Sequence, residues 1–202
     1  AEKAQGGSIT QMVGNNGYIK TTALYNTGVN DKGWSSSYLL TKWSGNGYIN
    51  NTSGAGTTYF FAVGYTPEGS NHSFNLSVLG AAQWHHQRDV WVSIRDYQNF
   101  GDVGIDRTWN TNGGTLNGEE FSMRRNFYNK PLATFKWDYK VADNIDLNTS
   151  FYASAGRGGG TGDIGRLGGR FLSDLAFRDS NGLVMWDKIA ASNSGTFTTF
   201  SN

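Results

Sequence analysis

The sequence predicts an all-β protein whose strands form an antiparallel meander. The strongest signal lies in residues 132–155, where two runs of strict two-residue alternation flank a short connection at 142–144. In the first run, Phe135 and Trp137 share one parity with other apolar residues, and Lys136 shares the other parity with polar residues. Successive side chains of a strand point to opposite faces, so this hairpin has one apolar face and one polar face.

The composition agrees with this fold class and excludes several functions. The 202 residues suit one domain, and 37% of them are apolar. With 28 glycines and 2 prolines, the chain suits a β-protein with long polar loops. The net charge of +1 comes without a basic stripe, which argues against nucleic-acid binding. No cysteine is present, so disulfides, thiol nucleophiles and cysteine metal sites are excluded.

The remaining strands follow from weaker alternation between turn signals. They are expected at residues 7–13, 18–26, 34–43, 57–66 and 72–79, with a short strand at 90–94. The regions 80–130 and 157–202 show little regularity. Connections of this length are uncommon in compact domains unless they carry function, so we expect long loops there.

The connections are unequal in length, and this asymmetry indicates a membrane barrel. If successive strands run antiparallel, the long connections fall at one end and most short turns at the other. The long ones are 44–56, 80–130 and 157–202, and the short ones are 27–33, 67–70 and 142–144. The short turn at 14–16 is the exception, because it falls at the long-loop end. Outer-membrane barrels combine short periplasmic turns, long extracellular loops and strands of about ten residues, as in the hairpin at 132–155.

Motifs for catalysis and cofactor binding are weak, so no catalytic residue, metal site or cofactor is predicted. Gly160 and Gly165 bound a GxGxxG match, but no regular helix follows it and the neighbouring strands are expected to be antiparallel. His85 and His86 are adjacent, so in a strand they point to opposite faces, and no second ligand lies at metal spacing.

Five residues in the expected loop 80–130 are candidates for contact with a ligand. They are Trp84, His85, Arg88, Arg124 and Arg125. Two adjacent arginines suit an anionic ligand, because guanidinium groups bind carboxylates and phosphates bidentately. The alternative interpretation is a solvated loop, or a lumenal ladder in which these arginines pair with Glu119 or Glu120.

Six stretches resemble the barrel of TonB-dependent outer-membrane receptors. They read GYIKTTALYNTG (17–28), LTKWSGNGYINNT (40–52), FNLSVLGAAQWHHQR (74–88), NGEEFSMRRNFYNKP (117–131), SFYASAGRGGGTGDIG (150–165) and NGLVMWDKIAASNS (181–194). The resemblance spans nearly the whole chain, and the order of the motifs is more specific than any one of them.

The resemblance implies a transport function in the outer membrane of a Gram-negative cell, and no enzyme activity. Such receptors are 22-stranded barrels with a plug in the lumen, and they import scarce nutrients with energy supplied by TonB. The chain shows neither a plug nor a TonB box, so residues 1–202 are expected to be a barrel segment of six or more strands from a longer receptor. TonB contact then lies outside this chain, outer-membrane lipid surrounds it, and a surface lipoprotein is a further possible partner.

A competing hypothesis is a soluble β-sandwich that binds carbohydrate through loop aromatics such as Trp84 and Trp109. The two hypotheses place the apolar face differently, toward lipid in the barrel and toward a second sheet in the sandwich. The barrel hypothesis predicts one shared outward face for Tyr59, Phe61, Val63, Phe74, Leu76, Val78, Phe135, Trp137, Ile145 and Leu147.

Overall fold

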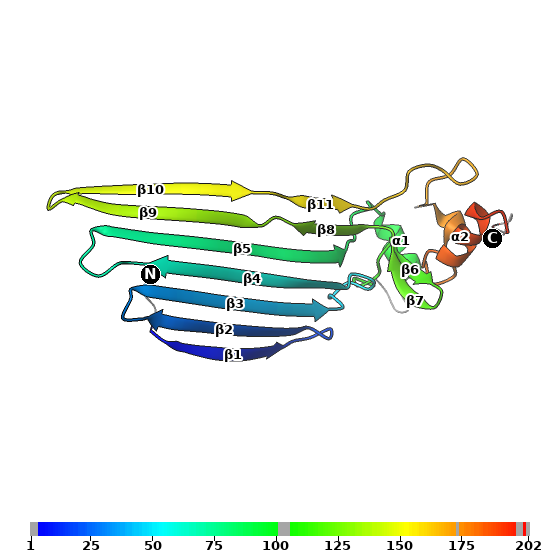
Figure 1. Ribbon diagram of the computed structural model, residues 1–202. Coiled ribbons are helices and arrows are strands. Elements are labelled where there is room, and N and C mark those ends of the chain that lie inside the picture. Colours follow the sequence, from blue (N-terminus) through cyan, green and yellow to red (C-terminus); the bar gives the residue numbers. More distant parts are fainter. Residues whose placement is uncertain (1–3, 101–105, 173, 197–199, 201–202) are drawn as a thin grey trace.

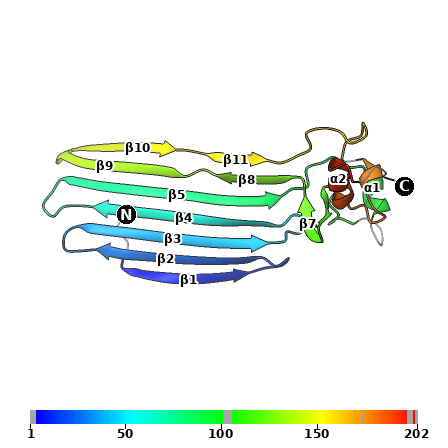
Figure 2. The ribbon, with the colours of Figure 1, turned by 45° about the vertical axis from the view of Figure 1, so that its right-hand side comes forward.

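The computed structural model describes residues 4–100, 106–172, 174–196 and 200. The largest element is one antiparallel sheet of nine strands, and a smaller region of helices and a hairpin lies at one end (Figure 1 and Figure 2). The strands of the sheet are β1 (Gly6–Val13), β2 (Ile19–Val29), β3 (Trp34–Gly45), β4 (Gly54–Tyr65), β5 (His72–His86), β8 (Arg125–Asn129), β9 (Leu132–Ala142), β10 (Ile145–Ser154) and β11 (Arg157–Gly160). The prediction of an all-β antiparallel fold is confirmed.

The sheet is a meander from β1 to β5, in which each strand pairs with the next one along the chain. β5 then pairs with β9 over its first half and with β8 over its second half. Pro131 separates β8 from β9, because proline has no N–H to continue the ladder. β10 and β11 pair with β9 and β8 in turn, so among the described residues the sheet is open, with β1 at one edge and β10 and β11 at the other.

The predicted asymmetry of the connections is confirmed. The turns after β2, β4 and β9 lie at one end of the sheet, and the long connections after β3, β5 and β11 lie at the other (Figure 1). The short turn after β1 lies at the long-loop end, as expected. There Asn16 and Gly17 both have positive φ, 57° and 65°, a conformation that favours asparagine and glycine.

The two faces of the sheet differ in chemistry. Residues directly opposite each other on paired strands point to the same face, and Phe61 is opposite both Tyr38 and Val78. This apolar face carries exposed side chains across the whole sheet: Tyr38, Leu40, Phe61, Leu76, Phe135, Leu147 and Phe151. Nine of the ten residues predicted to share a face do so by register. The tenth, Ile145, lies beyond a β-bulge and is opposite Ala142.

The opposite face, which we call the polar face, is mostly hydrophilic. Ser35, Asn75 and Lys136 lie in one row across it, linked through Gly64. One row of the polar face is different, because its residues are apolar in five neighbouring strands, β2, β3, β4, β5 and β9. Its members are Leu24, Leu39, Phe60, Leu79 and Leu132.

The hydrophobic core lies outside the sheet, in a region that we call the cap (the described parts of residues 87–124 and 161–200). Its elements are α1 (Ile94–Asn99), the hairpin of β6 (Gly113–Leu116) and β7 (Glu119–Ser122), the 3-10 helix η1 (Leu175–Phe177) and α2 (Trp186–Asn193). Among the described residues, the buried apolar side chains are Trp109, Phe177, Val184, Trp186 and Ile189. Within the described ranges, the sheet itself is therefore a single layer with both faces uncovered.

The structure corrects three predictions about the loops. β5 continues to His86, and β8 and β11 add strand pairs within the expected loops 80–130 and 157–202. The short strand expected at 90–94 is absent, and α1 begins at Ile94 instead. Ser93 and Asp96 form a capping box there, which stabilises a helix start.

Every helix among the described residues is too short or too polar to span a membrane. The described residues also provide no second sheet large enough to cover the apolar face, because the other sheet is the β6–β7 hairpin of the cap. The sandwich hypothesis requires such a layer.

Candidate functional site

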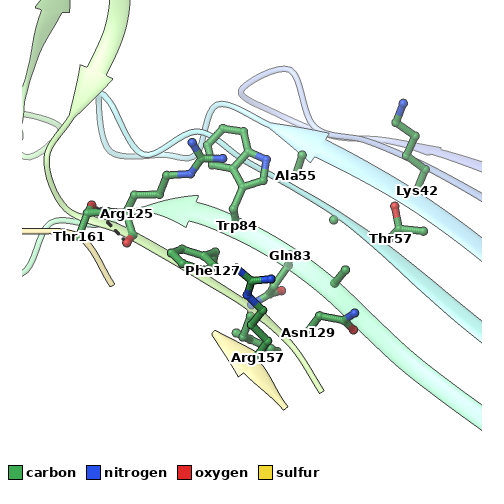
Figure 3. Close-up of a pocket in the computed structure, with 13 residues that line it drawn as sticks. Lys42, Ala55, Thr57, Gln83, Trp84, Arg125, Phe127, Asn129, Arg157 and Thr161 are labelled. Carbon is green, nitrogen blue, oxygen red and sulfur yellow. Dashed lines mark hydrogen bonds between the residues drawn. The ribbon is translucent and has the colours of Figure 1, made fainter. Parts of the chain in front are cut away.

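A groove of about 690 Å³ lies on the sheet near the cap, where β3, β4, β5, β8 and β11 end or begin. Most of its side chains belong to the apolar face, since Trp84 is opposite both Ala55 and Phe127. Figure 3 shows the side chains of Trp84, Arg125, Phe127 and Arg157 gathered around it. The lining residues include three cations, Lys42, Arg125 and Arg157, and no carboxylate.

The centre of the groove is a stack of Arg125 on Trp84. The guanidinium carbon of Arg125 lies 4.1 Å from the centroid of the Trp84 ring, which is a favourable cation–π distance. Thr161 accepts a 2.9 Å hydrogen bond from the backbone N–H of Arg125 through its Oγ1 (Figure 3). Two of the five predicted ligand residues, Trp84 and Arg125, therefore form one site.

Local sequence explains why the groove forms there. The break at Pro131 lets β8 pair with the second half of β5 and brings Arg125 beside Trp84. The groove floor is made of small side chains, including Ala55, Thr57 and Ala82. Small residues between large ones leave a depression in an otherwise crowded aromatic surface.

His85 lies on the other face of the sheet, so it is not part of the groove. Strand alternation turns it away from Trp84, and it lines a separate cavity of about 290 Å³ with Tyr18, Trp43 and Tyr48. The structure therefore does not bring these two candidate ligand residues into one site.

Arg88 belongs to the cap and has a structural role there. Its guanidinium donates hydrogen bonds to the backbone carbonyls of Arg107 and Trp109, at 3.0 and 3.3 Å. It also lies 5.8 Å from the centroid of the Tyr97 ring. These contacts hold two parts of the cap together, and they occupy donors that a ligand would need.

Arg124 lies between two carboxylates, and the predicted pairing with Glu119 or Glu120 is wrong. Its nearest carboxylate oxygens belong to Asp89, at 3.5 Å, and to Asp163, at 3.7 Å. Glu120 instead accepts a 2.7 Å hydrogen bond from Ser53 and lies 3.6 Å from Nδ1 of His86. Arg124 precedes β8, and its contacts are with these two carboxylates, whereas Arg125 lines the groove.

Trp109 is buried at 3% exposure, so it is no exposed platform for a sugar ring. Its indole N–H donates to the carbonyl of Gly182 at 3.3 Å, and the Arg178 guanidinium lies 5.5 Å from its ring centroid. Burial lowers the pKa of Arg178 to about 10, and the charges of Asp96 and Asp179 oppose this shift. This cluster organises the interior of the cap.

The sequence alone did not identify Lys42, Phe127 and Arg157 as site residues. They come from three strands that are distant along the chain, and only the register of those strands brings them to Trp84. In its strand, Lys42 has the same parity as Tyr38 and Leu40. This shared parity is the sequence signal that places Lys42 on the apolar face.

The part of the chain that the structure describes contains no group of three or more His, Asp or Glu side chains placed to hold a metal ion. The cations and aromatic rings of the groove instead suit an anion attached to an apolar body. Comparison of the chain with models of protein families, with curated proteins and with solved structures gave no match.

Proposed function

We propose that the chain forms part of the wall of an outer-membrane transport barrel of the TonB-dependent type. The apolar face contacts lipid, the polar face lines the lumen, and the cap lies on the extracellular side. The protein acts as a transporter for a scarce nutrient and has no catalytic role.

The observation that carries this proposal is a pair of aromatic rows on the apolar face. One row, near the short turns, contains Trp34, Tyr65, Phe74 and Trp137 in register. The other, near the cap, contains Trp84 and Phe127. Along β5 the two rows are ten residues apart, from Phe74 to Trp84, which is about 33 Å at ~3.3 Å per residue.

This separation matches the thickness of an outer membrane. Strands of such barrels tilt by about 40°, so 33 Å along a strand becomes a height of about 25 Å, which is the apolar band that aromatic girdles flank. Between the rows the apolar face is well exposed, with Phe61 at 53% and Leu76 at 51%. Side chains of this size in this position are stable when lipid covers them.

The polar face suits a lumen that is filled by protein. A depression of about 610 Å³ there is lined by Ser35, Ser73, Asn75, Lys136 and other polar residues. The apolar row from Leu24 to Leu132 crosses this face and would be costly against water alone. A plug domain packed in the lumen covers such a row, and we propose that this plug and the TonB box belong to sequence outside residues 1–202.

The two open edges of the sheet need further strands as pairing partners if the sheet lies in a membrane. Backbone groups at β1 and β10 have no partner on one side among the described residues, and unpaired groups cost several kcal/mol each in hydrocarbon. In the proposed protein, additional strands close the barrel to 22. The native polypeptide is then several times heavier than the 22.1 kDa of this chain.

Spin labels test the proposed orientation, and the absence of cysteine in the chain makes single-cysteine labelling simple. Phe61→Cys and Ala62→Cys are adjacent in β4 and lie on opposite faces. In native membranes, a label at position 61 should collide with oxygen, which dissolves in lipid, and be shielded from a water-soluble nickel chelate. A label at position 62 should show low oxygen access.

Equal oxygen access at both positions, or high nickel access at position 61, would overturn the proposed orientation. The mass of the native polypeptide is an independent check, because a value near 22.1 kDa contradicts the larger barrel.

A further inference from the structure

The groove near the cap carries more positive charge than the rest of the apolar face. We call Lys42, Trp84, Arg125, Phe127 and Arg157 the basic–aromatic cluster. All five lie on one face by register, because Lys42 is opposite Thr57, Phe127 is opposite Trp84, and Arg157 is opposite Asn129. They come from β3, β5, β8 and β11, and Figure 3 shows their side chains around the groove.

The three cations of the cluster are placed to receive an anion. Among the described residues, none of them forms an ion pair with a carboxylate, and no carboxylate lines the groove. The guanidinium carbon of Arg125 lies over the Trp84 ring, and the edge that carries its N–H groups forms no hydrogen bond among the described residues. A phosphate group accepts hydrogen bonds from such an edge bidentately.

The surroundings of the cluster suit an apolar body on the same molecule. From the groove toward the short turns, the face continues through Leu40 and Tyr59 to Phe61. Lys42 and Arg157 lie one row closer to these residues than Trp84 does, so the cations border directly on the apolar band. An occupant with a charged head and hydrocarbon chains complements both parts.

We infer that the basic–aromatic cluster binds the phosphate of an anionic lipid, with the acyl chains lying along the apolar face. This inference rests on the proposed function, which puts the apolar face in lipid and the cluster at the edge of the apolar band, beside the headgroups. The cluster is then a lipid site on the outside of the barrel, separate from any nutrient site in the lumen or the cap.

Native mass spectrometry tests the inference. The native polypeptide is released from micelles that contain phosphatidic acid and an excess of phosphatidylcholine, and the retained lipid is identified. Wild-type protein should retain phosphatidic acid preferentially. The double variant Arg125→Gln/Arg157→Gln should weaken retention by about tenfold or more, because two charge-assisted contacts are removed.

Lys136→Gln is the matched control, because it removes one cation from the polar face of the same sheet and should leave retention unchanged. Adding inorganic phosphate tells a lipid site from a phosphate site. Free phosphate should displace the lipid poorly, and displacement at equal concentration would show that the acyl chains contribute nothing and would overturn the lipid assignment.

Two outcomes separate this inference from the proposed function. If the spin label at position 61 is exposed to lipid but phosphatidic acid shows no preference, or the double variant retains it normally, the lipid site alone is refuted. If the label at position 61 is exposed to water, the proposed function is refuted first and the lipid site with it.

Discussion

The indole N–H of Trp137 donates a hydrogen bond to Nδ1 of His72, with 3.1 Å between the nitrogens. The bond joins β9 to β5 within the aromatic row near the short turns. His72 also stacks on Tyr139, with ring centroids 4.2 Å apart. This row therefore combines aromatic packing with a polar contact, as expected where hydrocarbon meets headgroups.

We expect Trp137→Phe to destabilise the sheet by about 1 kcal/mol, because it keeps most of the aromatic surface and removes this hydrogen bond. The free energy of unfolding in lipid vesicles measures the effect. Trp34→Phe is the control, since Trp34 stacks on Tyr65 at 4.2 Å and its indole N–H has no acceptor among the described residues. Equal losses in the two variants would contradict a role for the bond.

Phe135→Arg should destabilise the protein in a bilayer by more than the ~1 kcal/mol of an interfacial position and by less than the ~4 kcal/mol of the midplane, since Phe135 lies one row inside the aromatic row of Trp137. Thr134→Arg places the same charge at nearly the same height on the polar face and should cost much less. Vesicle unfolding of both variants gives the comparison. A Phe135→Arg variant as stable as wild type would count against lipid contact at this position.

Phe177→Ala should unfold the cap while the sheet persists. Phe177 is 2% exposed in the core with Val184, Trp186 and Ile189, and truncating a buried phenylalanine costs about 3–5 kcal/mol. Hydrogen exchange should rise in α2 and β6 and remain slow in β4, which is paired on both sides. Uniformly faster exchange in both regions would show that the cap and the sheet unfold together.

Asp106 should make a loop of the cap sensitive to acid. Hydrogen bonds from the side chain and backbone of Thr108 hold the pKa of Asp106 below its usual 3.8. The ionised form is thus favoured in the folded state, and this stability is complete above about pH 4 and is lost as the pH falls through the lowered pKa. The amide chemical shift of Thr108 should report the transition.

Asp106→Asn is the control for this titration, because asparagine preserves the shape and cannot ionise. The Thr108 shift should then be flat across the acid range. A transition in wild type centred above pH 4 would contradict the direction of the pKa shift.

The sequence predicted the strands best where alternation is strict and the partner is near in sequence. The hairpin of β9 and β10 meets both conditions, and its arms lie within the predicted residues 132–155. The second half of β5 was missed because Gly80, Ala81 and Ala82 carry no alternation. β8 and β11 were missed because each is short and depends on register with a distant strand.

The cap core and the groove could not be predicted from sequence patterns, because both depend on contacts between residues that are distant in the chain. Phe121 and Trp186 are distant in the chain, but their ring centroids are 5.3 Å apart in the cap core. Trp84 and Arg125 were both chosen as ligand residues, and only the break at Pro131 determines that they meet. His85, Arg88 and Arg124 had equally suitable chemistry and were directed elsewhere by strand parity or by cap contacts.

The separate core of the cap has a consequence for how the protein can change over time. Substitutions on the cap surface perturb a small folding unit, while the register of the sheet rests on its own ladder of backbone bonds. Mutations in the cap can therefore create new recognition properties without changing the strand register of the sheet.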